Sequence, residues 1–380
     1  MTTGPQKAGT HQEVLDALAA KGRLRALTRS RGCDFTSNDY LALADSDVLR
    51  RAASDALARG VPLGAGGSRL LRGNHPEHEA LEEEAASFFG SETALYFPTG
   101  FAANAAIAAT LPRRGDLIVY DSLIHASFRD GLEPDRIRAI EAPHNDVSAM
   151  ETIIKGWRAA GATGRVWIGA ETLYSMDGDR APLADLAALA ARHDAMLLLD
   201  EAHATGVYGE QGRGLGARYE GAPNIISLHT CGKALGAAGA LVCMPRLYRD
   251  YLVNRGRAFI YSTAPSPLLA AVVRAALTFS AGAEQERAQL RHLVRHAEDR
   301  MRSLGLPTSG SQIQPVILGE DRRAVAVANA LQARGHDIRA IRPPTVPEGT
   351  ARLRIALTLH VTPEDVDGLF ADLQAEMAQS

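Results

Sequence analysis

The chain has 380 residues, of which 46% are apolar, and a formal net charge of −3 with both signs spread along it. This length suits one large domain with a smaller one, or two to three domains, and the apolar fraction allows a sizeable core. The even charge distribution argues against a nucleic-acid or membrane partner. Three scattered cysteines argue against a disulfide framework and a cysteine-based metal site, and we see no signal peptide or membrane span. We therefore expect a metal-free protein in a reducing compartment such as the cytoplasm.

The first part of the chain predicts a helix, a short strand and a glycine-rich loop. The helix is expected over residues 12–29 with Arg23 on it, where a solvated charge is the ordinary interpretation. Asn38 lies in a polar turn after the strand, and its amide could hold a ligand, although an asparagine there more often caps the turn. Five glycines in residues 60–75 exclude a regular helix, and Pro76 then opens a helix to about Phe89.

A second chemical signal lies at the turn between a strand at 94–97 and the alanine-rich helix that follows. Thr99, Gly100 and Phe101 occupy this turn. Backbone N–H groups at a helix start attract anions, so the turn predicts a phosphate site. An ordinary strand-to-helix turn would have the same sequence pattern.

Polar side chains follow three buried strands, predicted at 117–120, 166–170 and 196–199, and ligands bind beyond the carboxyl ends of such strands. His125 follows the first strand, and its flat ring could stack on an aromatic cofactor. Asp200 ends the third strand, where a carboxylate needs a partner. A protonated pyridine nitrogen is such a partner, and the alternative is an aspartate that caps the next turn. His203 follows closely enough to brace the same ring.

One lysine organises these signals. Lys233 stands between Gly232 and Gly236, which let a ligand approach the backbone, and Thr230 offers a hydroxyl group to an anion. We predict that Lys233 forms a Schiff base with pyridoxal phosphate (PLP) and that Asp200 pairs with the cofactor's pyridine nitrogen. The alternative for this segment is a tight strand-to-loop turn.

The remaining segments predict an α/β protein. We expect strands at 225–228, 239–243, 314–318 and 352–358, an extended piece at 337–341, and helices within 266–305 and at 322–334 and 363–378. The predicted domains are an N-terminal arm over 1–44, a large domain over 45–280 and a smaller α+β domain over 281–380. Arg342, Thr345 and Arg354 could contact an anion there, although surface salt bridges are the ordinary role of such arginines.

The order of these motifs resembles that of the α-oxoamine synthases, PLP enzymes of the aspartate-aminotransferase fold (fold type I). The likeness runs from about Leu15 to Leu373. It is carried by Phe35-Thr-Ser-Asn-Asp-Tyr-Leu-Ala-Leu, Gly64-Ala-Gly-Gly-Ser-Arg-Leu, Thr99-Gly-Phe-Ala-Ala-Asn, Ser175-Met-Asp-Gly-Asp, Asp200-Glu-Ala-His-Ala-Thr-Gly and Thr230-Cys-Gly-Lys-Ala-Leu-Gly. His75-Pro-Glu-His and Ile341-Arg-Pro-Pro-Thr-Val-Pro favour the biotin branch. The resemblance implies a large, mixed, mostly parallel sheet domain and a smaller α+β domain at the C-terminus.

The resemblance also implies a role for each matching residue. It gives catalytic roles to Lys233, His125, Asp200 and His203. It places Ser175 beside His203 at the cofactor's phenolic oxygen, and it assigns the phosphate to Gly100, Phe101 and Thr230. It assigns the amino-acid carboxylate to Asn38 and Arg354, and the acyl substrate to Arg23 and Thr345. Ala42 and Cys231 depart from the usual residues of the family, but neither removes a catalytic group.

The implied reaction joins L-alanine to pimeloyl-CoA, or to a pimeloyl group on acyl carrier protein, with loss of CO2, in a homodimer with active sites at the interface. Glycine- or serine-using relatives are the alternatives, namely 2-amino-3-ketobutyrate CoA ligase, 5-aminolevulinate synthase and serine palmitoyltransferase. An aminotransferase of the same fold is a further alternative. A non-catalytic PLP-fold protein is disfavoured because Lys233 and Asp200 are present, and a serine hydrolase because no Gly-x-Ser-x-Gly motif is visible.

Overall fold

The computed structural model describes residues 10–133 and 136–378. These residues divide into two compact units, one made of residues 38–290 and the other of residues 10–37 together with 291–378. The N-terminal segment thus groups with the C-terminal part of the chain. The domain boundaries after residues 44 and 280 that the sequence suggests remain a proposal beside this division.

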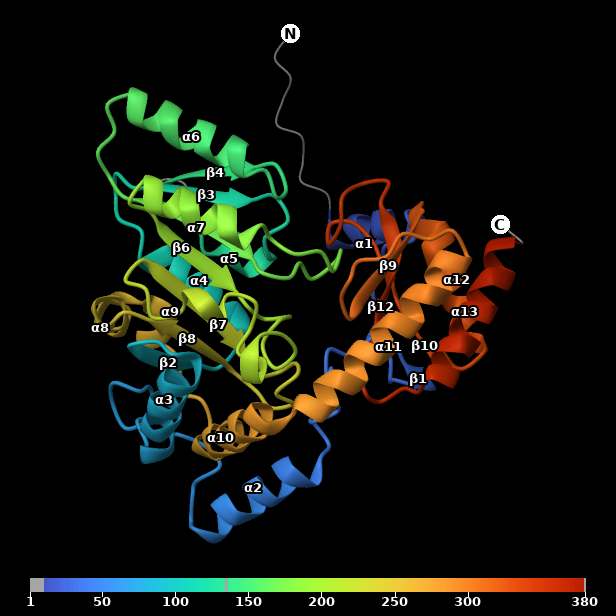
Figure 1. The fold of residues 1–380 in the computed structure, drawn as a ribbon, viewed down its shortest axis with the longest axis horizontal. Coiled ribbons are helices and arrows are strands. Elements are labelled where there is room, and N and C mark those ends of the chain that lie inside the picture. The colour runs from blue at the N-terminus through green and yellow to red at the C-terminus, as the bar shows by residue number, and fades with distance from the viewer. Residues whose placement is uncertain (1–9, 134–135, 379–380) are drawn as a thin grey trace. The chain divides into compact units, whose positions relative to one another are not determined.

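The larger unit is built around a seven-stranded sheet with the order β2-β8-β7-β6-β5-β3-β4 (Figure 1). Its strands are β2 (Thr93–Phe97), β3 (Leu117–Asp121), β4 (Arg138–Ala142), β5 (Val166–Glu171), β6 (Met196–Asp200), β7 (Ile225–Thr230) and β8 (Ala240–Met244). The strands from β4 to β7 pair in parallel, and β8 runs against both of its neighbours. The strand β6 lies in the middle and is buried throughout, as its apolar run predicts. The predicted α/β class with a mostly parallel sheet is confirmed.

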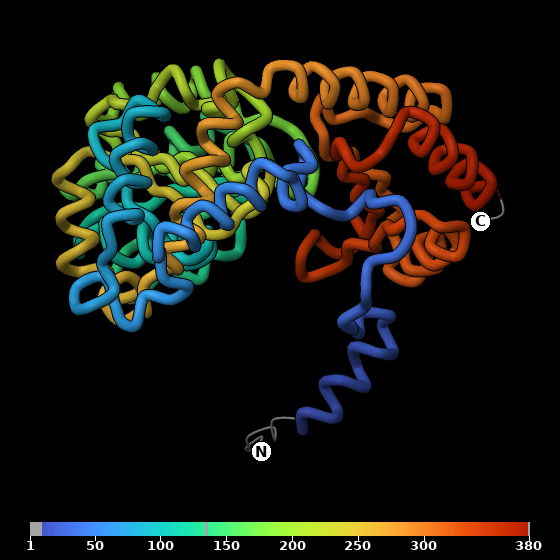
Figure 2. The backbone as a smooth tube through the Cα atoms, turned by 90° about the horizontal axis from the view of Figure 1, so that it is seen from below, coloured from blue at the N-terminus to red at the C-terminus, as the bar shows by residue number. Residues whose placement is uncertain are grey.

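Helices cover both faces of this sheet. One face packs against α4 (Gly100–Thr110), α5 (Ala126–Asp130), α8 (Arg246–Arg255) and α9 (Arg257–Ile260), and the other against α3 (Pro76–Phe89), α6 (Val147–Ala159), α7 (Leu183–Arg192) and α10 (Pro267–Gly282). Because side chains alternate along a strand, Leu95 and Phe97 of β2 join the first face, and Ala94 and Tyr96 join the second. The helix α2 (Asp47–Ala58) packs beside α10, although the two are far apart in sequence (Figure 2).

The helix α3 has the bounds that the sequence predicts, Pro76–Phe89. Pro76 opens it, where a missing N–H costs no hydrogen bond, and Glu77 and Glu79 lie in its first turn near the positive end of the helix dipole. Gly90 ends it with a φ of 81°, a left-handed conformation that glycine adopts without strain.

The N-terminal helix is shorter than predicted. The helix α1 covers His11–Ala20 rather than residues 12–29, so the prediction was wrong for its second half. The chain leaves the helix at Gly22, which has a φ of 67°, a conformation incompatible with continued α-helix. Arg23 and Arg25 therefore lie after the helix and not on it. The elements predicted from the sequence do not include α2, α5, α6, α8, α9 and β4.

The smaller unit contains two sheets. The strand β1 (Cys33–Asp34) pairs in parallel with β10 (His336–Asp337), and β12 (Ala351–Ala356) lies between β9 (Ile313–Gly319) and β11 (Ala340–Ile341) in an antiparallel sheet. Its helices are α1, α12 (Asp321–Ala333), α13 (Pro363–Ala378) and most of α11 (Glu284–Ser303). In the part of the chain that the structure describes, no single helix is long and apolar enough to cross a membrane, and α10 and α11 meet that test only as a bent pair.

Candidate active site

A cavity of about 370 Å³ lies at the carboxyl ends of the central strands in the larger unit. Its walls come from the ends of β5, β6 and β7, from the N-terminus of α4 and from the segment around Lys233. The volume lies in the range of small-molecule sites, and the position is the one where parallel α/β sheets bind ligands. This cavity is the candidate active site.

The cavity brings together most of the residues that the sequence singles out. Its lining includes Gly100, Phe101, His125, Asp200, His203, Thr230 and Lys233. Ser175 does not line it, but its backbone N–H donates to the lining residue Glu171 at 3.1 Å. Asn38 lies two residues before Tyr40, whose hydroxyl group contacts His203. The other three predicted substrate contacts, Arg23, Thr345 and Arg354, belong to the smaller unit.

Asp200 is held by hydrogen bonds at both carboxylate oxygens. The amide Nδ2 of Asn104 donates to Oδ2 at 2.6 Å, and the backbone N–H of Ala202 donates to Oδ1 at 2.9 Å. The residue is only 8% exposed. Two donors from different elements thus fix the position of the Asp200 carboxyl group at the end of β6, where it suits a cationic ring nitrogen.

The ring of His125 is oriented by the same network. Asn104 also donates to Oγ of Ser127 at 3.1 Å. The backbone N–H of Ser127 donates to Nδ1 of His125 at 3.2 Å, and the Ser127 hydroxyl lies 2.8 Å from the same nitrogen. Because Nδ1 accepts the N–H of Ser127, the hydroxyl is its donor as well, and the ring proton of the neutral histidine lies on Nε2. Burial lowers the pKa of His125, so a neutral imidazole faces the cavity.

Lys233 begins a second chain of hydrogen bonds. Its Nζ lies 2.7 Å from Nε2 of His203, whose Nδ1 lies 2.7 Å from the hydroxyl oxygen of Tyr40. The Tyr40 hydroxyl donates to Oδ1 of Asn38 at 3.0 Å, so it accepts from Nδ1–H of His203. His203 then accepts from the lysine at Nε2. This direction of donors fixes the histidine tautomer and aims the lysine amine.

The turn before α4 forms an anion cradle. The Thr99 hydroxyl accepts the N–H of Ala102, so the earlier N–H groups of Gly100 and Phe101 remain at the helix end facing the cavity. A Cβ atom at Gly100 would lie 2.7 Å from Cγ2 of Thr230, which only glycine avoids. The Thr230 hydroxyl donates to the carbonyl of Ala202 at 3.2 Å, and this bond holds the side chain against the cradle.

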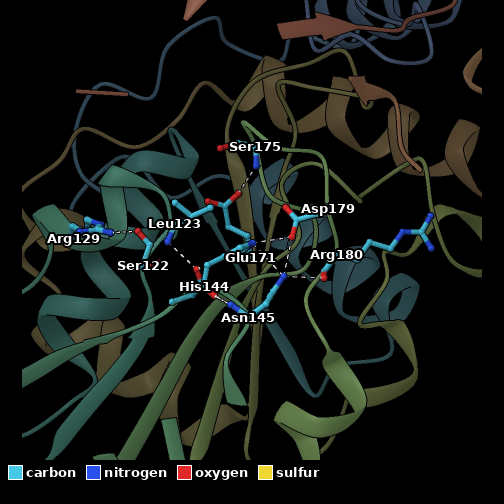
Figure 3. A network of polar contacts seen from close by, with 10 residues as sticks. Ser122, Leu123, Arg129, His144, Asn145, Glu171, Ser175, Asp179 and Arg180 are labelled. Carbon is cyan, nitrogen blue, oxygen red and sulfur yellow. Dashed lines mark hydrogen bonds and ion pairs between the residues drawn. The ribbon is translucent and has the colours of Figure 1, made fainter. Parts of the chain in front are cut away.

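A half-buried histidine anchors the segment that carries Ser175 (Figure 3). Nδ1 of His144 lies 2.9 Å from Asp121, and Nε2 lies 2.8 Å from Asp179. Burial disfavours the charged imidazolium, but the two aspartates outweigh it and raise the pKa of His144 to about 10. The neighbouring Asn145 also donates to Asp179, at 2.8 Å. The end of β3 and the segment after β5 are thereby linked.

The site residues predicted from the sequence do not include Tyr40, Asn104, Ser127 and Glu171, which belong to the networks around the cavity. Glu171 ends β5 as Asp200 ends β6, so the strand-end pattern that found Asp200 could have found it. Asn104 lies four residues after Gly100 on α4, which places both on the same side of a helix. No local pattern identifies Tyr40 or Ser127, because their partners come from other elements.

In the smaller unit, the predicted acyl-substrate contacts have protein partners. Arg23 donates to Glu348 at 2.8 Å and to Asp321, and these contacts raise its pKa above the usual range. The Thr345 hydroxyl accepts from Arg25 at 3.3 Å. Arg354 is 7% exposed on β12. The substrate roles of these residues stay predictions.

Known proteins resemble this chain over most of its length. The family model for aminotransferase class I and II matches residues 31–373, and the chain belongs to this family. An 8-amino-7-oxononanoate synthase from Herminiimonas arsenicoxydans is 42% identical over 90% of this chain and 89% of its own. Among solved structures, the chain is similar to the 8-amino-7-oxononanoate synthase of Francisella tularensis, with a TM-score of 0.78, 26% identity and coverage of 92% and 98%. The chain is also similar to serine palmitoyltransferase from S. paucimobilis with a bound PLP–myriocin aldimine. The TM-score is 0.84 and the sequence identity is 26%, over 91% of this chain and 87% of that one.

The cavity fits the cofactor that these comparisons indicate. A fixed carboxylate, an amine and a glycine cradle at a helix N-terminus match the pyridine nitrogen, the aldehyde and the phosphate of PLP. The predicted fold and the predicted PLP cofactor are confirmed by the family match and by the PLP-bound structures of similar fold.

Proposed function

We propose that the chain catalyses the decarboxylative condensation of L-alanine with a pimeloyl thioester, giving 8-amino-7-oxononanoate, CO2 and a free thiol in biotin biosynthesis. One observation carries the proposal at the level of the site. Lys233 and the hydrogen-bonded Asp200 line the same cavity, in a chain whose relatives over nearly its whole length are named for this synthase. The thiol of the substrate belongs to CoA or to an acyl carrier protein.

PLP supplies an electron sink that stabilises negative charge on the carbon bearing the amino group. Asp200 would pair with the protonated ring nitrogen, and Asn104 with the N–H of Ala202 holds its carboxyl group in place. Because these donors are already arranged before substrate binds, no reorganisation is needed when the charge develops.

Lys233 moves the proton. With cofactor and substrate bound, Nζ of Lys233 would take the proton from the substrate Cα and later return one. His203 accepts a hydrogen bond from Nζ, which keeps the amine aimed into the cavity. The neutral His125 offers its Nε2–H to the cavity, where it can polarise the carbonyl group of the incoming thioester as well as stack on the ring.

Substrate recognition and assembly complete the proposal. We assign the alanine carboxylate to Asn38 and Arg354, because arginine binds carboxylates through two parallel donors. We assign the acyl substrate to Arg23 and Thr345. We further propose a homodimer with active sites at the interface, as in the family that the sequence resembles. A cytoplasmic location agrees with three cysteines that form no disulfide in the structure.

The purified protein with PLP tests the proposal. Absorbance should show PLP bound to the lysine, and L-alanine with pimeloyl-CoA should release one CO2 and one thiol for each 8-amino-7-oxononanoate. Glycine and serine with other acyl-CoA thioesters form the comparison set, because serine palmitoyltransferases share the fold. Preference for serine or glycine would overturn the substrate assignment. Release of a keto acid without thioester consumption would instead indicate an aminotransferase.

A further inference from the structure

A second carboxyl group, Glu171, forms part of the cavity wall. It ends β5 directly beside Asp200, its register partner on β6. Glu171 is only 2% exposed and lines the cavity with Asp200 and Lys233. The reaction as proposed above gives it no role, although burying a carboxyl group at this depth is costly without a purpose.

The two carboxyl oxygens of Glu171 differ. Oε2 accepts the backbone N–H of Ser175 at 3.1 Å, a contact visible in Figure 3. Oε1 is buried and has no hydrogen-bond partner among the described residues. A buried polar atom of this kind calls for an explanation, and a ligand in the cavity that Glu171 lines would supply the missing partner.

Burial and neighbouring charges act on the carboxyl group of Glu171. Asp200 accepts two strong hydrogen bonds, whereas Glu171 accepts one. The charged groups that act on Glu171 are Asp200 from β6, Asp121 from β3 and Lys233. Burial, and then the charge of Asp200, raise the pKa of Glu171 well above its ordinary value. Since Oε2 accepts an N–H, the proton of the neutral acid lies on Oε1.

The strand order indicates which part of the cofactor Glu171 would meet. Thr230 of β7, at the phosphate cradle, and Glu171 of β5 lie on opposite sides of Asp200 on β6. In PLP, the phosphate arm and the phenolic oxygen also lie on opposite edges of the axis through the ring nitrogen. With the nitrogen at Asp200 and the phosphate towards β7, the phenolic oxygen would face β5.

We propose that Glu171 is a neutral carboxylic acid that donates a hydrogen bond from Oε1 to the phenolic oxygen of PLP. This inference rests on the proposed function, because it takes PLP as the bound group. A neutral Glu171 stabilises negative charge on the phenolic oxygen without adding a second negative charge beside Asp200. An ionised Glu171 would repel that oxygen and compete with Asp200 for the ring's positive charge.

Two substitutions separate the neutral from the ionised state. Glu171→Gln keeps an acceptor for Ser175 N–H and places an amide donor at Oε1, so it mimics the neutral acid. Glu171→Leu keeps the approximate volume and removes both functions. We expect E171Q to bind PLP as the wild type does, with the same pH dependence of cofactor absorbance. E171L should bind PLP roughly tenfold more weakly, the loss that one hydrogen bond produces. It should also protonate the phenolic oxygen at a higher pH.

A carboxyl group outside the cavity provides the matched control. Glu201 follows Asp200 but turns away to accept the N–H groups of Leu215 and Gly216. Glu201→Gln should therefore leave the cofactor's absorbance and its pH dependence unchanged. A change in E201Q equal to that in E171L would overturn the proposal, because the effect would then come from any buried carboxyl group near this strand end.

The proton itself is observable without cofactor. Infrared difference spectra of wild-type and E171Q apoprotein should show the carbonyl band of a protonated carboxyl group that is lost in the variant. Since folding raises the pKa of Glu171, the wild type should lose stability relative to E171Q as pH rises above the unfolded value near 4.5. Absence of both signals, or E171Q behaving like E171L towards PLP, would overturn the inference. Failure of the proposed function would instead appear as wild-type protein that does not bind PLP or condense the substrates.

Discussion

The polar side chains singled out from the sequence have different partners in the two units of the chain. In residues 38–290, the polar groups of the cavity form two ordered chains of hydrogen bonds. One runs from Asp200 through Asn104 and Ser127 to His125, and the other from Lys233 through His203 to Tyr40. In the smaller unit, Arg23 is instead neutralised by two carboxylates. The predicted cofactor contacts thus all lie within the larger unit.

Because of this difference, we expect substitutions in the two units to change different measured quantities. Changes in the larger unit should alter the spectrum of the bound cofactor, because its partners are fixed there before substrate arrives. Changes at the predicted substrate contacts of the smaller unit should leave that spectrum intact and act on the KM for substrate.

Replacing the lysine should have the largest effect. Lys233→Ala removes the amine that binds PLP and moves the proton, so turnover should fall by at least roughly 10⁴-fold. The absorbance of lysine-bound cofactor should also disappear. Absorbance spectra and single-turnover assays measure both. If the variant keeps the wild-type spectrum and rate, the cofactor assignment of this lysine is wrong.

Replacing Asp200 at the end of β6 should have the second largest effect on turnover. Asp200→Asn keeps the shape but loses the charge that holds the ring proton, and we expect a fall in kcat of roughly 10²–10³-fold with PLP still bound. Asn104→Ala should have a smaller effect of the same kind, because the Ala202 N–H still holds Oδ1. Ser127→Ala is the matched control, since it breaks the chain on the His125 side and leaves the 2.6 Å contact of Asn104 with Asp200. Equal losses in the Asn104 and Ser127 variants would show that orientation of Asp200 is not the cause.

The sequence allowed the cofactor half of the site to be predicted because its signals are local. Asp200 follows an uninterrupted buried run, and Lys233 stands between glycines, so each can be recognised within a few residues. Tyr40 could not be found in this way, since its partner His203 lies 163 residues away. The tautomers of the histidines depend on such long-range contacts and follow only from the structure.

The errors in the secondary structure have similar causes. Leu24 and Leu27 continue the helical spacing beyond Gly22, but one glycine in a left-handed conformation outweighs a weak periodicity in an exposed segment. The strand β4 was missed because it lies at the sheet edge with only one of its five residues, Ala142, buried, so it lacks the apolar run of β6. The amphipathic spacing of Met150, Ile154 and Trp157 in α6 was visible and could have been used.

A substrate contact of the smaller unit should give an intermediate effect. Arg354→Lys keeps the charge but loses the two-pronged geometry, so the KM for L-alanine should rise by roughly tenfold with the cofactor spectrum unchanged. Arg23→Gln should raise the KM for the acyl substrate and not that for alanine. Steady-state assays with each substrate varied separately distinguish the two. A change in the cofactor spectrum of R354K before substrate is added would contradict the separation between the units.

Replacing His144, which lies between Asp121 and Asp179, should have the smallest effect on catalysis and a measurable effect on the free energy of unfolding. Below a pH of about 6.5, His144 is charged in both the folded and unfolded states, and its contacts with Asp121 and Asp179 contribute fully. Because folding raises the pKa of His144 to about 10, this contribution declines as pH rises above 6.5 and is lost as pH passes through 10. His144→Gln should thus be less stable by about 2 kcal/mol at neutral pH, the value of hydrogen bonds to a charged group.

Denaturant unfolding of wild type and H144Q at several pH values measures this difference, and comparing the two cancels groups that titrate in both. Asp179→Asn, which keeps the Asp121 partner, should show a smaller loss over a narrower pH range. A difference between wild type and H144Q that stays constant up to pH 10 would mean that His144 acts through packing and not through its charge. Because His144 lies outside the cavity lining, PLP-bound H144Q should keep the wild-type absorbance wherever it remains folded.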